Sequence, residues 1–245
     1  MLVMFGLILM HILGDFYLQT NKIAKAKTNK DNENSLFINY KYLTIHSLLY
    51  CIPFISLFFI QKWYWSLLIL FIILISHWIT DLFTCWFKRK TKITFALLLD
   101  QTIHIIVLFL IFYIFDYDTS VLVQYNKLIY GSTIILFLIK PSIVFVDHIF
   151  YDVFKSKNEI SSIVIDNTNF DVGSIIGVFE RIMVLILSMF NAITAMAIII
   201  TVKTWARSND IKTKEGFGNK YLVGTLASIS LALIAAYAWN KLMYS

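Results

Sequence analysis

Long apolar runs, separated by short polar stretches, divide the chain into predicted helical segments. Each run holds about 18 residues or more with few charges, which at ~1.5 Å per residue is enough to cross the ~30 Å hydrocarbon layer of a bilayer. We therefore predict an all-α fold, a polytopic transmembrane helix bundle. The predicted helices occupy residues 2–19, 41–60, 63–87, 93–115, 127–150, 172–202 and 221–239.

Two prolines interrupt this pattern. Pro53 predicts a kink in the second helix, because proline lacks the N–H that an α-helix requires. Lys140-Pro141 predicts that the fifth segment is kinked or split into two half-helices. The basic loops that follow the first, third and sixth segments all face the cytoplasm only if this fifth segment does not cross. We therefore predict six spanning helices plus one broken or re-entrant segment, or seven helices if it crosses.

Composition agrees with a membrane protein. Hydrophobic residues make up 59% of the 245 residues and charged residues only 15%, whereas soluble domains are about 45–50% apolar and about 25% charged. The net charge of +6 comes from lysines clustered in short loops, where they act as topology signals, so no nucleic-acid partner is expected. Cys51 and Cys85 both lie inside apolar runs, which argues against a disulfide framework. The apolar N-terminal run lacks a basic start and a cleavage site, so we expect a retained helix.

Polar side chains inside the first four apolar segments follow a pattern. His11, Asp15 and Gln19 recur every four residues and would form one stripe on a helix. Successive helices alternate in direction, so the end of the first, the start of the second, the end of the third and the start of the fourth share one membrane face. Seven titratable residues are therefore expected to meet in one leaflet: His11, Asp15, His46, His77, Asp81, Asp100 and His104.

Imidazoles and carboxylates placed together suit zinc, manganese or iron, so we expect a divalent metal, as one or two ions. All seven titratable residues are candidate ligands. Asp15 and Asp100 are also candidate catalytic bases, and Gln19 and Gln101 are candidates for orienting water or substrate. Two other interpretations of the same residues stay open: a metal-free proton or ion relay, and a purely structural polar network.

The rest of the chain carries fewer candidate functional residues. Lys88, Glu180 and Arg181 are candidates for contacting a lipid headgroup, and the Glu180-Arg181 pair could instead belong to a buried ion-pair network. We expect a single integral membrane domain over residues 1–245. Residues 1–115 would form a four-helix half that carries the His/Asp site, and residues 116–245 would add the broken segment and two supporting helices.

These motifs resemble a bacterial membrane family known as domain of unknown function 3307. The family name implies no activity. A looser similarity, in the intramembrane His and Asp pattern, is to bacterial inner-membrane proteins described as metal-dependent hydrolases. The resemblance rests on His11-x2-Gly14-Asp15-Phe16-x2-Gln19, His46, His77-x3-Asp81, Lys88, Asp100-Gln101-x2-His104, Gly173-x3-Gly177-x2-Glu180-Arg181, Lys203-x3-Arg207 and Tyr221-Leu222-Val223-Gly224-Thr225-x2-Ser228.

The leading expectation is an intramembrane metal-dependent enzyme that hydrolyses a lipid-borne ester or phosphoester at the cytoplasmic leaflet of the bacterial cytoplasmic membrane. Its partner would be a membrane lipid or lipid-linked substrate. One alternative is an ion- or proton-coupled transporter or channel, which a broken segment at Pro141 would favour. Another is a membrane effector that acts with a soluble partner. The sequence leaves the substrate and the oligomeric state open.

Overall fold

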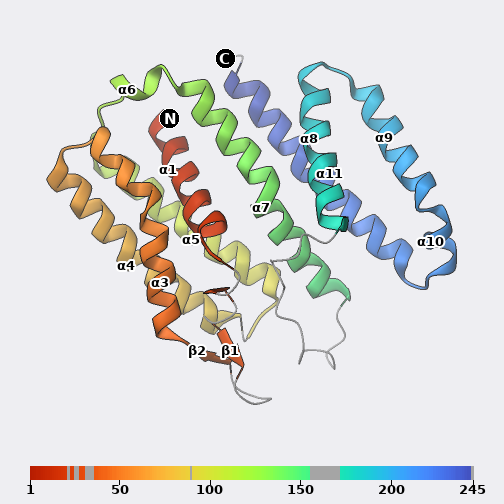
Figure 1. Cartoon of the computed structure of the whole chain (residues 1–245), viewed down its shortest axis with the longest axis horizontal. Coiled ribbons are helices and arrows are strands. Elements are labelled where there is room, and N and C mark those ends of the chain that lie inside the picture. The colour runs from red at the N-terminus through yellow and green to blue at the C-terminus, as the bar shows by residue number, and fades with distance from the viewer. Residues whose placement is uncertain (21–22, 25–27, 31–35, 89, 155–171, 244–245) are drawn as a thin grey trace. The chain divides into compact units, whose positions relative to one another are not determined.

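The fold is helical throughout most of the chain (Figure 1). The computed structural model describes the chain except for residues 21–22, 25–27, 31–35, 89, 155–171 and 244–245. A short antiparallel ribbon is the addition to the predicted all-α architecture: β1 (Thr28–Lys30) pairs with β2 (Leu36–Ile38), with Thr28 opposite Ile38. The prediction of an all-α membrane helix bundle is otherwise confirmed.

The chain divides into two compact units. Unit 1 comprises Met1–Thr133, and the described part of unit 2 comprises residues 134–154 and 172–243. Whether the two units act as the single predicted domain, with a site-bearing half that ends at residue 115, stays a prediction. The helices of unit 1 are α1 (Leu2–Ile12), the π turn η1 (Leu13–Tyr17), α3 (Tyr40–Cys51), the 3₁₀ helix η2 (Pro53–Phe59), α4 (Trp63–Phe87), α5 (Ile93–Ile114), α6 (Ser120–Val123) and the start of α7 (Asn126–Phe154).

In unit 1, α4 packs against both α3 and α5, and α1 packs against α5 (Figure 1). The apolar core of this unit is built from α1, α3, η2, α4 and α5, and it lies beside the buried polar side chains described below. Its fully or nearly fully buried members are Val3, Leu7, Tyr50, Phe54, Leu57, Ile60, Ile69, Ile73, Leu108 and Ile111.

Helix α4 shows how a membrane segment can be polar inside and apolar outside. Its exposed face carries Phe71, Ile75, Ile79 and Phe83 at four-residue intervals. Its buried face instead carries apolar residues at one end and polar ones at the other: Ile69, Ile73, His77, Thr80, Asp81 and Thr84. Exposed apolar stripes of this kind are stable against lipid tails, whereas water would penalise them.

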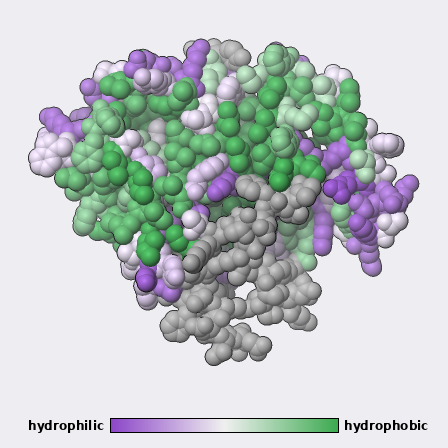
Figure 2. Space-filling model, in the orientation of Figure 1, coloured by the Kyte–Doolittle hydropathy of each residue, from purple (hydrophilic) through white to green (hydrophobic). Residues whose placement is uncertain are grey.

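The exposed surface and the helix lengths both fit a membrane protein. Figure 2 shows hydrophobic side chains over much of the visible helical surface, with hydrophilic ones gathered in patches. Among the described residues, five helical stretches are long and apolar enough to cross a membrane: Tyr40–Phe59, Trp63–Phe87, Ile93–Ile114, Asn126–Phe154 and Phe217–Met243. The first predicted helix is one of two shorter apolar helices, and its α-helical part ends at Ile12.

The predicted split at Pro141 is not observed. α7 runs as one helix from Asn126 to Phe154 with Pro141 inside it, so of the two predicted alternatives, a kink or a split into half-helices, the split is wrong. In the second segment the α-helix does end just before Pro53, where a 3₁₀ helix begins. Proline lacks the N–H that would donate to the carbonyl four residues earlier, and membrane helices tolerate this loss when other groups satisfy that carbonyl.

The predicted helix over residues 172–202 is also wrong, because it is two helices. They are α8 (Val172–Met189) and α9 (Ile193–Ala206), joined by a turn in which Asn191 adopts a positive φ of 52°. Asparagine tolerates this left-handed conformation better than most residues. Unit 2 is completed by the rest of α7, α10 (Ser208–Thr213) and α11 (Phe217–Met243), and α8 packs mainly against α11.

Candidate metal centre

Seven titratable side chains lie buried in the interior of unit 1. The histidines on α3 and α4 are the deepest, with His46 0% and His77 1% exposed. They come from five helical segments, of which η1 directly follows α1. The contributors are His11 from α1, Asp15 from η1, His46 from α3, His77 and Asp81 from α4, and Asp100 and His104 from α5.

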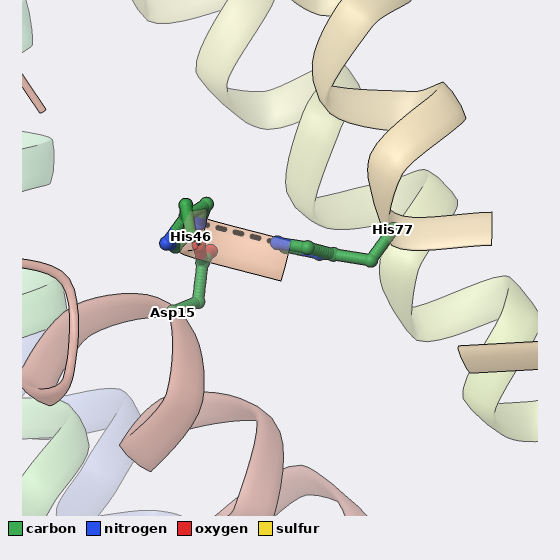
Figure 3. A group of neighbouring side chains, drawn as sticks. All are labelled: Asp15, His46 and His77. Atoms are coloured by element: carbon green, nitrogen blue, oxygen red, sulfur yellow. Dashed lines mark hydrogen bonds and ion pairs between the residues drawn. The ribbon is translucent and has the colours of Figure 1, made fainter. Parts of the chain in front are cut away.

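A π turn places Asp15. The backbone widens to π geometry over Leu13–Tyr17, and such single wide turns are frequent at functional sites. Gly14, inside this turn, lies directly against α3: a Cβ at this position would be 2.7 Å from the Tyr50 carbonyl oxygen. Only glycine allows η1 and α3 to approach so closely. This approach places the Asp15 carboxylate beside His46 (Figure 3).

The first group of possible ligands is Asp15, His46 and His77. Figure 3 shows the Asp15 and His77 side chains pointing toward the His46 ring. His46 Nε2 lies 3.1 Å from His77 Nε2 and 3.3 Å from Asp15 Oδ1. Three donor atoms from three different helical segments therefore surround one point.

The second group is His77, Asp81 and His104, so His77 belongs to both groups. Asp81 Oδ2 lies 3.7 Å from His77 Nε2 and 3.6 Å from His46 Nε2. Asp81 Oδ1 lies 3.9 Å from His104 Nε2. The two carboxylate oxygens of Asp81 thus connect histidines from α3, α4 and α5.

These separations fit donors arranged around a cation. Ligand atoms ~2.1 Å from a tetrahedral metal lie about 3.4 Å from one another. The ion pairs and the His46–His77 contact described above span 3.1–3.9 Å, and all donor atoms of each group lie within 4.8 Å of one another. The Asp81 oxygens, at 3.6–3.9 Å from the ring nitrogens, are too distant for good hydrogen bonds. The two His/Asp groups could therefore hold a metal ion, and imidazole nitrogen with carboxylate oxygen suits zinc, manganese or iron.

Gln101 holds the two remaining carboxylates. Its amide nitrogen donates to Asp15 Oδ2 at 2.9 Å and to Asp100 Oδ2 at 3.2 Å. Its amide oxygen must then face His11, whose Nε2–H donates to it at 3.0 Å. Asp100 Oδ1 also accepts a hydrogen bond of 2.8 Å from the Thr84 hydroxyl. The predicted role of Gln101 in orienting water or substrate stays a prediction.

His11 and Asp100 lie outside both possible ligand groups, although both were candidate ligands from the sequence. The reason is the hydrogen bonding of His11: its Nδ1 contacts the Tyr50 hydroxyl at 2.8 Å and its Nε2 contacts Gln101. Both ring nitrogens are thus occupied by protein groups. Asp100 is oriented by Thr84 and Gln101, and its Oδ1 lies 3.7 Å from His104 Nε2.

Tyr50 is a functional-site residue that the sequence reasoning missed. Its ring stacks on the His77 ring with a centroid separation of 3.7 Å and an interplanar angle of 4°. Histidines that bind metals usually have the second ring nitrogen hydrogen-bonded, but among the described residues His77 Nδ1 has no such partner. Stacking on Tyr50 therefore fixes the His77 ring. Its spacing in the sequence could have indicated it, because Tyr50 follows His46 by four residues and therefore lies on the same face of the helix.

Four predicted residues are not members of this cluster. Gln19 follows η1 and is no longer helical, because the first helix ends in the π turn, so the predicted stripe stops at Asp15. Lys88 caps the C-terminal end of α4. Glu180 and Arg181 belong to α8 in unit 2 and are described further below.

A family model described as protein of unknown function (DUF3307) matches residues 3–130. The chain belongs to the DUF3307 family. The matched residues contain every member of the buried cluster, so the cluster lies within the part that defines DUF3307. The C-terminal motifs that begin at Gly173 fall outside the match. No curated protein and no solved structure was found to match this DUF3307 chain.

Proposed function

We propose that this protein is an integral membrane metalloenzyme that hydrolyses a lipid-borne ester or phosphoester. One observation carries the proposal. The Nε2 atoms of His46, His77 and His104 converge with the Asp15 and Asp81 carboxylates at separations of 3.1–3.9 Å inside an apolar helix bundle. Burying so many titratable groups in a membrane protein is costly unless they have a function together.

The burial of the individual side chains suggests their roles. His46, His77, Asp81 and His104 are deeply buried, with side chains 0–4% exposed, and we assign them, together with Asp15 of the first group, as metal ligands. Asp15 and Asp100 lie at the more open edge, with side chains 10% and 9% exposed. This edge is where water or a substrate would reach the cluster.

A bound divalent ion, as zinc, manganese or iron, would lower the pKa of its water toward ~7 and polarise a carbonyl or phosphoryl oxygen. Asp15 is a candidate to accept a proton from this water, and Gln101 orients its carboxylate by donating to Oδ2. Asp100 is held in the same way by Gln101 and Thr84. Gln101 thus positions both candidate bases.

The surface around the cluster supports a lipid-borne substrate. α4 and α5 present large apolar side chains outward, including Phe71 and Phe109, so a molecule approaching from the side comes from the bilayer. The basic loop between these helices supports a site that faces the cytoplasmic leaflet of a bacterial cytoplasmic membrane. Lys88, at the end of α4, would contact an anionic headgroup there.

The transport alternative loses the slight support that a broken helix at Pro141 would have given it, since α7 is continuous through Pro141. Among the described residues, the possible ligand groups come from α3, α4, α5 and η1. Hydrolysis therefore remains the function that the geometry supports best.

Lipid profiling tests the proposal in cells. Cells expressing the native protein should deplete one lipid class and accumulate its hydrolysis product, and cells expressing Asp15→Asn should not. Asp118→Asn is the matched control, because Asp118 is a carboxylate of unit 1 whose Oδ1 caps the start of α6, outside the cluster. Identical lipid profiles for the native protein and Asp15→Asn would overturn the hydrolase assignment.

A further inference from the structure

Arg181 is a buried cation in unit 2. It projects from α8, is only 3% exposed, and contacts two other helices. Its Nε donates to the Leu138 carbonyl of α7 at 2.9 Å, and its Nη1 donates to the Ser228 hydroxyl of α11 at 3.0 Å. The guanidinium lies over Gly177, where a Cβ would be 3.2 Å from Nη1. Nη2 is buried and has no hydrogen-bond partner within the described parts of the chain.

The main-chain carbonyl that accepts from Arg181 lies in α7, three residues before Pro141. The Leu138 carbonyl also accepts from the Ser142 hydroxyl. Arg181 is therefore held by neutral oxygens, and these contacts do not neutralise its charge.

The nearby carboxylates act on this charge without forming a direct ion pair with it among the described residues. Glu180 and Asp147 act electrostatically on Arg181, but in the described structure neither lies within ion-pair distance of the guanidinium. Glu180 instead accepts from Lys203 Nζ of α9 at 2.6 Å. A buried guanidinium without a counterion is costly in an apolar bundle, so an anion bound there would be strongly stabilising.

A polar track leads from Arg181 to the surface. Ser228, which accepts from Arg181, lies three residues after Thr225 on α11, and Thr225 accepts from Lys203 at 3.3 Å. The side chain of Lys203 is 23% exposed. The charged groups Arg181, Lys203 and Glu180, together with two hydroxyls of α11, thus extend from the interior of unit 2 to its surface.

We propose that Arg181, Ser228 and Lys203 form a binding site for a phosphate oxyanion, supplied by the headgroup of an acidic phospholipid. The free Nη2 of Arg181 and the Nζ of Lys203 would donate to the phosphate oxygens, since charge-assisted bonds of guanidinium to phosphate are strong. Basic pockets between membrane helices are suited to acidic headgroups. The site lies in unit 2 and does not depend on the proposed hydrolase function.

The test uses the full-length protein in nanodiscs of phosphatidylcholine alone or mixed with phosphatidylglycerol. We measure the phosphatidylglycerol that remains bound in native mass spectrometry and the thermal unfolding midpoint. The native protein should retain phosphatidylglycerol and unfold at a higher temperature in the mixture. Arg181→Lys keeps the charge but loses the planar set of donors, and it should weaken retention about tenfold, as should Lys203→Gln.

Arg207→Gln is the matched control. Arg207 is a half-exposed arginine at the end of α9 that pairs with Asp210, so its loss removes one positive charge outside the site. Retention of the acidic lipid should be unchanged in this variant. Inorganic phosphate that raises the midpoint of the native protein in phosphatidylcholine, with chloride inactive, supports the oxyanion site and assigns a soluble source. No preference in the native protein, or equal losses in Arg181→Lys and Arg207→Gln, would overturn the proposal.

Discussion

His46 Nε2 and His77 Nε2 lie 3.1 Å apart in the interior of unit 1, where α3 meets α4. Two neutral imidazoles at this distance share a single proton between these nitrogens. The carboxylates of Asp15 and Asp81 lie 3.3 Å and 3.6 Å from the same His46 nitrogen. One N–H on His46 Nε2 cannot donate well to both His77 and Asp15, whereas a metal cation could bind all three of these groups. This arrangement leads to the predictions that follow.

The shared position of His77 predicts how metal content responds to mutation. His77→Ala removes a member of both ligand groups and should abolish metal binding. His104→Ala disrupts only the group with Asp81, and Asp15→Asn only the group with His46. If two ions bind, each of these two variants should keep about half of the native metal content. Metal titration monitored by calorimetry measures these stoichiometries, and full content in His77→Ala would contradict the grouping.

Gly14→Ala should destabilise the fold at the π turn. The added Cβ would lie 2.7 Å from the Tyr50 carbonyl oxygen and 2.8 Å from Tyr50 Cδ2, so η1 must move away from α3. Overpacking of this kind costs about 1–3 kcal/mol and should weaken metal binding, because Asp15 moves as well. Gly6→Ala in α1 is the control, since a Cβ there has nothing within 4 Å and alanine favours helix. Thermal unfolding in detergent that shows equal effects of both substitutions would contradict the predicted contact.

Tyr50→Phe should separate hydrogen bonding from stacking. The variant loses the 2.8 Å contact to His11 Nδ1 but keeps the ring that stacks on His77. We expect a loss of about 1 kcal/mol in stability with near-native metal content. Tyr50→Leu removes both contacts and should also weaken metal binding, by about 10–100-fold. Metal competition assays compare the two variants, and equal metal affinities would show that stacking does not fix the His77 ring.

Gln101→Met should uncouple the two candidate bases. The apolar side chain leaves His11 Nε2–H, Asp15 Oδ2 and Asp100 Oδ2 without their shared amide partner. Unsatisfied buried groups cost about 1–3 kcal/mol each, so the unfolding midpoint should fall clearly. Thr102→Val, at the next position on α5, changes an exposed hydroxyl that returns to the Leu98 carbonyl and should have little effect. A Gln101→Met protein as stable as Thr102→Val would exclude the amide bridge.

The meeting of the polar residues could be predicted from the sequence because it depends on two simple regularities. Four-residue spacing places His77 with Asp81 and Asp100 with His104 on single helix faces. The alternation of helix direction then places both pairs at the same depth. The structure places the cluster in unit 1 accordingly, while its metal-binding role stays a prediction.

Other features could not be predicted because they depend on contacts between helices. Hydropathy does not distinguish a π turn from an α turn, so the position of Gln19 outside the helix was missed. The proline rule predicted a kink or a split at Pro141, but α7 continues as one helix through this residue. The turn at Asn191 was also missed, because the only local feature in the sequence that indicates it is an asparagine between two apolar runs.

Elemental analysis of the purified full-length protein tests the central claim most directly. The native protein should contain zinc, manganese or iron at one or two ions per chain, and His77→Ala should contain almost none. His148→Ala is the control, because it removes a buried histidine of unit 2 that lies outside the cluster. Native protein without stoichiometric metal, or metal content unchanged in a folded His77→Ala protein, would contradict the account.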